Sequence, residues 1–81
     1  MSKSVHSPLY ERLRQLLIER RQQAGLTQAQ LAKRLSKPQS YISKYEKGER
    51  RLDVVELIEV AEAAGFDFQA FTVELTEDSG R

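Results

Sequence analysis

The sequence contains no cysteine and no tryptophan, and its single histidine is His6. Without cysteine the chain has no disulfide and no thiolate metal site, a composition that suits a reducing cytosol. His6 lies in a polar stretch with no second histidine nearby, so we expect no metal and no cofactor. No apolar run reaches the roughly 18 residues of a membrane span, and the first eight residues do not resemble a signal peptide. We therefore expect a cytoplasmic protein.

The groups of common enzyme active sites are also lacking. The sequence has no paired catalytic carboxylates, no Ser or Cys nucleophile next to a base, and no glycine-rich phosphate loop. We therefore expect a binding protein and not an enzyme.

Acidic residues are scarce in the first part of the chain. Residues 1–51 hold four Asp or Glu against twelve Lys or Arg, whereas residues 52–81 hold eight acidic residues and one basic residue. This division predicts that the first part meets a polyanion and that the second part does not. The alternative is a solvated surface on which the charges are segregated by chance.

Signals for helices recur, and signals for strands do not. Side chains suited to cap a helix start occur at Ser7, Thr27, Asp53 and Asp67. Apolar pairs stand at staple positions around three of these starts: Leu26 with Leu31, Leu52 with Leu57, and Phe66 with Phe71. Glycines suited to end helices stand at Gly25, Gly48 and Gly65. We expect one all-α domain over residues 1–81 with its core at about 8–75, residues 1–6 and 77–81 flexible, and fraying from Thr76.

Helical spacing also predicts which side chains face the core. The expected inward residues are Leu9, Leu13, Leu16, Leu17, Leu31, Ala32, Leu35, Ile42, Tyr45, Val55, Ile58 and Ala61.

Residues 26–51 read as two short helices joined by a tight turn, the second starting at Pro38 or Gln39 and ending near Lys47. If Ile42 and Tyr45 face inward, the outer face of this second helix carries Gln39, Ser40, Ser43 and Lys44. These side chains suit base edges in a DNA major groove, since Gln pairs with adenine, Lys reaches guanine and Ser accepts several bases. The bland alternative is an ordinary polar helix face in water.

Other residues around these two helices suit phosphates. Thr27 and Gln28 open the first of these helices, whose free N–H groups favour an anion. Lys47, Arg50 and Arg51 stand at the end of the second helix and after it, where the chain can run along the DNA backbone. Tyr41 either contacts a phosphate or covers the edge of the motif. Three more basic residues either add to the positive field or, as we favour, keep the surface soluble: Lys33, Arg34 and Lys37.

Several of these residues together resemble the phage-repressor-like helix-turn-helix domains of the Cro/C1 or XRE type. The matching residues are Thr27-Gln28, Leu31-Ala32, Leu35, Ile42-Ser43, Glu46, and Gly48 with the basic residues after it. The resemblance implies a five-helix lambda-repressor-like bundle whose third helix enters the major groove of double-stranded DNA. It implies base reading by Gln39, Ser40, Ser43 and Lys44, and phosphate contacts at Gln28, Lys47 and Arg50–Arg51. Ser36 departs from the family, which often has Gly in the turn.

Two further expectations concern Glu46 and the last helix. Glu46 either discourages non-specific DNA binding or, as we favour and as is common in this family, pairs with Arg21. The apolar residues Phe68, Phe71, Val73 and Leu75 either close the core or, as we favour, form a two-fold dimer interface. We thus expect a homodimeric repressor bound to a palindromic operator. The alternative is an antitoxin or anti-regulator that binds a protein partner through its acidic C-terminal half.

Overall fold

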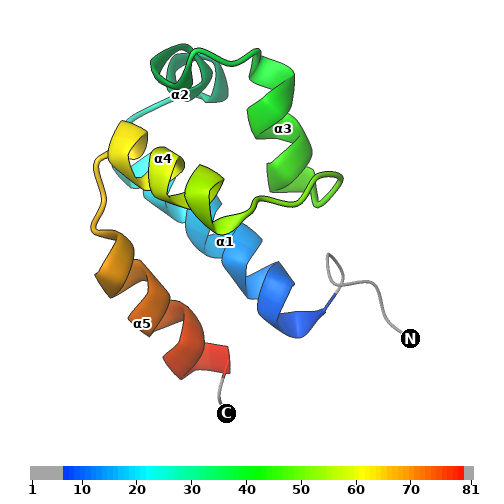
Figure 1. Cartoon of the computed structure of the whole chain (residues 1–81), viewed down its shortest axis with the longest axis vertical. Helices are drawn as coiled ribbons and strands as arrows, with labels where there is room; N and C mark the ends of the chain where they lie inside the picture. Colours follow the sequence, from blue (N-terminus) through cyan, green and yellow to red (C-terminus); the bar gives the residue numbers. More distant parts are fainter. Residues whose placement is uncertain (1–6, 80–81) are drawn as a thin grey trace.

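The computed structural model describes residues 7–79, and over this range it contains five helices and no strand (Figure 1). The helices are α1 (Pro8–Gln23), α2 (Gln28–Leu35), α3 (Gln39–Lys47), α4 (Val54–Ala64) and α5 (Phe68–Ser79). The all-α prediction is confirmed. His6 and residues 80–81, on which some expectations fall, lie outside the described residues.

The helices begin at the predicted capping residues. Side-chain oxygens accept hydrogen bonds from first-turn N–H groups at Ser7, Thr27, Asp53 and Asp67. In α2 and α4 the third helical residue, Gln30 or Glu56, returns a bond to the N-cap N–H and completes a capping box. α3 differs, because its N-cap is Pro38 and makes no side-chain bond. Of the two starts considered for this helix, Gln39 is the one found.

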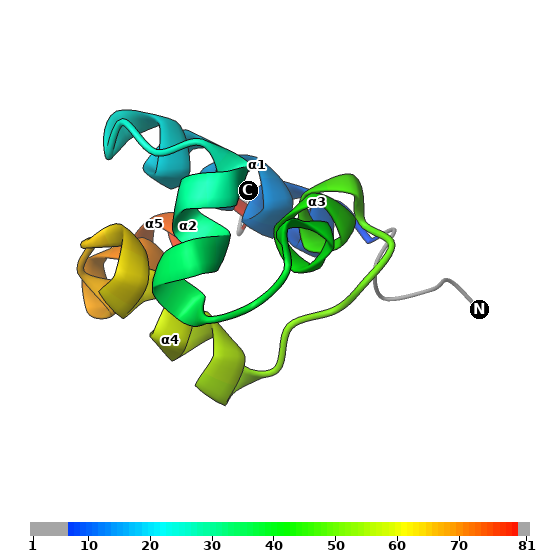
Figure 2. The same ribbon diagram turned by 90° about the horizontal axis from the view of Figure 1, so that it is seen from above.

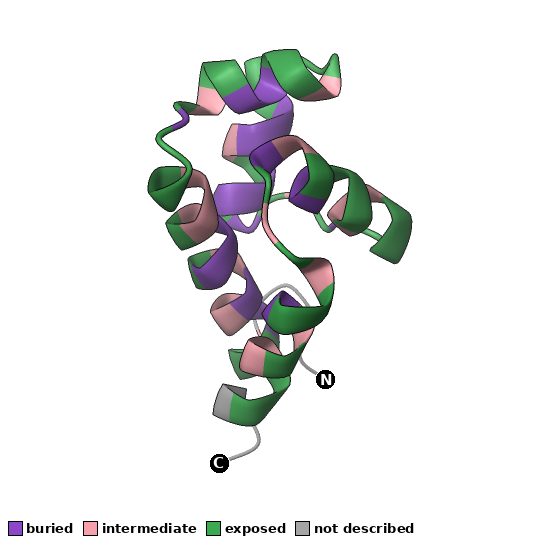
Figure 3. Cartoon of the chain, turned by 90° about the vertical axis from the view of Figure 1, so that its left-hand side faces the viewer, coloured by how far each residue is buried: buried purple, intermediate pink, exposed green. Residues whose placement is uncertain are grey.

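α1, the longest helix, lies between α3 and α5, and α2 and α4 complete the bundle (Figures 1 and 2). α3 and α5 both contact α1, while α2 bridges α3 and α4. Buried residues lie where helices face each other, and exposed residues cover the outer faces (Figure 3). The arrangement leaves the outer side of α3 open.

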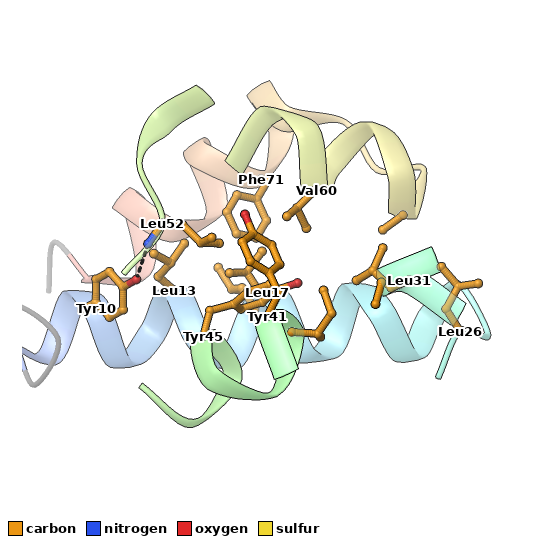
Figure 4. Close-up of a cluster of buried hydrophobic side chains, with 14 residues drawn as sticks. Tyr10, Leu13, Leu17, Leu26, Leu31, Tyr41, Tyr45, Leu52, Val60 and Phe71 are labelled. Atoms are coloured by element: carbon orange, nitrogen blue, oxygen red, sulfur yellow. Dashed lines mark hydrogen bonds between the residues drawn. The ribbon is translucent and has the colours of Figure 1, made fainter. Parts of the chain in front are cut away.

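The core lies between α1 and the helices that surround it (Figure 4). Six large side chains are almost completely buried: Tyr45, Phe71, Leu16, Leu31, Ile42 and Val60. The Tyr10 hydroxyl accepts a hydrogen bond of 3.1 Å from Leu52 N, which ties α1 to the segment before α4. The rings of Phe66 and Phe71 lie 5.1 Å apart, as the predicted staple requires.

Three residues expected in the core are exposed instead: Leu9, Val55 and Ile58. α4 buries Val60, Ala61 and Ala64, so the predicted inward face was rotated about the helix axis. The reason is that α4 is apolar on several sides, and periodicity then does not specify one face. Leu9 lies at the end of α1, where Tyr10 and Leu13 already occupy the core side.

α5 continues to Ser79, beyond the point where we expected it to fray. Phe71 is fully buried and Leu75 packs against the core, so the helix is anchored on two successive turns. Once anchored, a helix extends by a further turn at little cost.

Candidate nucleic-acid interface

The side chains expected to read bases lie on the open side of α3. Gln39, Ser40 and Lys44 are exposed and Ser43 is half-buried. The opposite side of the helix packs inward through Tyr41, Ile42, Tyr45 and Glu46. The outer face therefore has hydrogen-bonding groups without an acidic side chain, as a DNA groove requires.

The turn before α3 adopts the conformation that the family usually achieves with glycine. Ser36 has φ 57° and ψ 40°, in the left-handed region, although it is serine. The N–H groups of Ser36 and Lys37 bond to Lys33 O at 3.1 Å and Ala32 O at 2.9 Å. The departure at Ser36 thus leaves the geometry of the turn intact.

Glu46 lies at the centre of a polar network that joins α1, α2 and α3. Arg21 Nε and Nη2 donate to its two carboxylate oxygens at 2.7 and 3.0 Å. Gln28 Nε2 donates to Glu46 Oε1 at 2.9 Å, and Gln39 Nε2 donates to Gln28 Oε1 at 3.3 Å. The network therefore runs from a buried carboxylate to a side chain expected to read a base.

The Arg21–Glu46 contact is shielded from water. The exposed fractions of the two side chains are 13% and 5%. The hydrogen bonds with Glu46 raise the pKa of Arg21 above its ordinary value. Since Glu46 points inward, the geometry favours the structural role over a role on the DNA-facing side.

Arg14 is a structural contributor that the sequence reasoning missed. Its guanidinium donates to the backbone oxygen of Glu46 and, at 2.6 Å, to Glu11 Oε1. Gly48 leaves room for it, because a Cβ there would lie 3.2 Å from Arg14 Nε. A signal was available, since the last carbonyls of a helix lack partners and attract a basic side chain.

The residues expected to bind phosphates occupy two places. At the start of α2, the N–H groups of Thr27 and Gln30 are taken by the capping box. Those of Gln28 and Ala29 have no acceptor within the described residues and stay open to an anion. Lys47, the last residue of α3, and Arg51, in the segment after it, are both exposed. The Arg51 guanidinium lies 5.4 Å from the centre of the Tyr10 ring.

Tyr41 lies under two cations at the N-terminal end of α3. The Arg50 guanidinium is 4.6 Å and Lys37 Nζ 5.3 Å from the centre of its ring. Tyr41 is buried, and this burial raises the pKa of its hydroxyl. Of the two roles considered, the position favours that of covering the edge of the motif. Lys37, which we assigned to solubility, lies beside the N-terminal turn of α3, through its contact with the Tyr41 ring.

The four residues expected at a dimer interface have different environments. Phe71 is fully buried in the core of its own chain, so its side chain is not available for contact with a second chain. Phe68 and Leu75 are half-buried, and Val73 is 52% exposed. Other exposed apolar side chains lie on α4: Val54, Val55 and Ile58.

Comparisons with known proteins agree with this geometry. The helix-turn-helix family profile matches residues 17–71. An XRE-family-like protein from Pseudomonas syringae pv. tomato str. DC3000 is 43% identical, with 91% of this chain and 90% of that chain covered and a TM-score of 0.85.

More distant structures share the fold. The wild-type restriction-modification controller protein C.Esp1396I is 22% identical, with 94% of this chain and all of that chain covered and a TM-score of 0.82. A point mutant of the same controller protein is 23% identical over 93% and 100% of the two chains, with a TM-score of 0.83.

No curated protein sequence matches significantly. No helix within residues 7–79 is long and apolar enough to cross a membrane. The chain belongs to the XRE family of helix-turn-helix DNA-binding transcription regulators.

Proposed function

We propose that this protein is a sequence-specific repressor that binds a palindromic operator as a homodimer. α3 lies in the major groove, where Gln39, Ser40, Ser43 and Lys44 contact base edges. The observation that carries this proposal is the outer face of α3, which is exposed, free of acids and held from behind by the Glu46 network.

Contacts to the DNA backbone fix the position of α3 in the groove. The open N–H groups at the start of α2 approach one phosphate, and Lys47, Arg50 and Arg51 approach others. Thr27 borders the first phosphate, and Tyr41 supports Arg50 from beneath. These contacts supply the salt-dependent part of the affinity.

Selection of bound sequences from a random duplex library tests the proposal. The Gln39→Ala variant is run in parallel, with Gln69→Ala, an exposed change on α5, as the matched control. We expect a two-fold symmetric consensus that loosens at matching positions of both half-sites in the Gln39 variant only. Absence of any enriched sequence would overturn the proposal.

A second candidate function is an antitoxin or anti-regulator that binds a protein. The exposed side chains of Val54, Val55 and Ile58 on α4, in the acidic half of the chain, favour it. The product of a neighbouring gene would then bind the chain, and Val55→Glu would abolish that binding while Gln39→Ala would not.

A further inference from the structure

Arg50 is held at several points in the free protein. Its Nη1 donates to Glu56 Oε1 at 3.2 Å and to Arg51 O at 2.8 Å, and its Nη2 donates to Glu56 Oε2 at 2.9 Å. The ring of Tyr41 supports one face of the guanidinium. A flexible side chain is thereby fixed in one orientation.

Glu56 is itself fixed by the backbone. Its Oε1 accepts the Asp53 N–H at 3.0 Å, and its own N–H donates to Asp53 Oδ1 at 2.8 Å. These are the two bonds of the α4 capping box, so the Glu56 carboxylate cannot leave Arg50 without breaking the hydrogen bonds at the start of the helix. The position of the carboxylate beside Arg50 is therefore fixed by the fold of α4.

The bonds to Glu56 and Arg51 leave one edge of the guanidinium unused. Both N–H groups of Nη1 and one of Nη2 are engaged, while Nε–H and the second N–H of Nη2 have no acceptor in the described part of the chain. These two groups lie side by side and match two oxygens of a phosphate. The guanidinium lies over the ring of Tyr41, a residue of the first turn of α3 that follows Gln39 and Ser40 in the sequence.

We propose that Glu56 is a positioning residue for DNA binding: it holds Arg50 so that the free edge of the guanidinium receives a phosphate of the operator. This inference rests on the proposed function, because it takes Arg50 to contact DNA. It assigns to an acidic residue of α4 a favourable effect on binding a polyanion. Without the structure the opposite effect would be expected from its charge.

A double-mutant cycle tests the proposal. A labelled duplex carrying the selected consensus is titrated with wild type, Glu56→Gln, Arg50→Ala and the double variant at several salt concentrations. Glutamine at position 56 keeps the capping box, and thermal unfolding checks that each variant is folded. Glu59→Gln is the matched control, since it removes one charge from an exposed position of the same helix.

We expect Glu56→Gln to weaken binding about three- to tenfold and to lower the salt slope by up to about one. Glu59→Gln should leave the affinity equal or slightly tighter, and Glu56→Gln should have no effect once Arg50 is alanine.

Tighter binding by Glu56→Gln than by Glu59→Gln would overturn the proposal, because Glu56 would then sequester Arg50. An equal loss in both Arg50 backgrounds would also overturn it. If wild type binds no duplex, the proposed function fails as well; if wild type binds and the two Glu variants behave alike, only this inference fails.

Discussion

Glu46 is a carboxylate surrounded by donors from two other helices, and replacing it tests what a buried pair contributes at the scale of one residue. Glu46→Ala would leave Arg21 and Gln28 without their acceptor in a site shielded from water. We expect a loss of about 3–5 kcal/mol of unfolding free energy and a melting temperature lower by more than about 10 °C. Urea and thermal unfolding measure this, with Glu49→Ala as an exposed control. Normal stability with altered base preference would contradict the structural role.

Tyr45 makes stability sensitive to alkaline pH. Its side chain is almost fully buried, and burial raises the pKa of its hydroxyl well above the ordinary value. In the unfolded chain the hydroxyl ionises near pH 10, whereas in the folded chain it stays neutral. Stability is therefore complete below about pH 10 and falls as pH rises beyond it. The urea midpoint of Tyr45→Phe should fall less between about pH 9 and pH 11 than that of wild type. Equal losses would contradict this assignment.

At the scale of the element, Ser36 is the point where the α2–α3 turn carries strain. A non-glycine residue in the left-handed region costs about 1–2 kcal/mol, and Ser36 is such a residue. Glycine would remove this cost, but its greater freedom in the unfolded chain would offset part of the stabilisation. We expect Ser36→Gly to stabilise the fold by about 0.5–1 kcal/mol. Gly25→Ala, at φ +73° with open space around its Cβ, should destabilise by a similar amount. Denaturant unfolding checks both signs, and a loss of stability in Ser36→Gly would contradict the strain.

The element scale also separates what the sequence could predict from what it could not. Caps and staples are local, since residues three to five positions apart satisfy one another, and the starts predicted at Ser7, Thr27, Asp53 and Asp67 are found. The inward face of α4 depends on what packs against it, and an apolar stretch does not reveal this. The contact between Glu56 and Arg50 was missed because these residues stand six positions apart, beyond the spacing of caps and staples.

At the scale of the whole molecule, the charge division is softened by internal pairs. Arg12 and Arg20 of α1 both pair with Glu74 of α5, so part of the basic excess holds the bundle together. Lys44, Lys47 and Arg51 remain exposed around α3. The basic surface around α3 is therefore smaller than the basic part of the sequence suggested.

The proposed homodimer gives a prediction at the same scale. Wild type should sediment as a dimer at tens of micromolar, and Val73→Glu should shift it to monomer because a charge would enter the contact. Val55→Glu places the same charge on α4 and should leave the dimer intact. The opposite pattern would move the interface to α4, and a monomeric wild type would contradict the dimer.

Arg14, Arg21 and Gly48 hold α3 by its inner side and its C-terminal end, while the side chains expected to read bases project from the other side. Apart from Gln39, which also bonds to Gln28, the residues that hold α3 and those expected to read bases are different. A library randomised at Ser40, Ser43 and Lys44 should therefore consist mostly of folded proteins. Such a scaffold is suited to retargeting, since new operator preferences can be selected without repairing the fold each time.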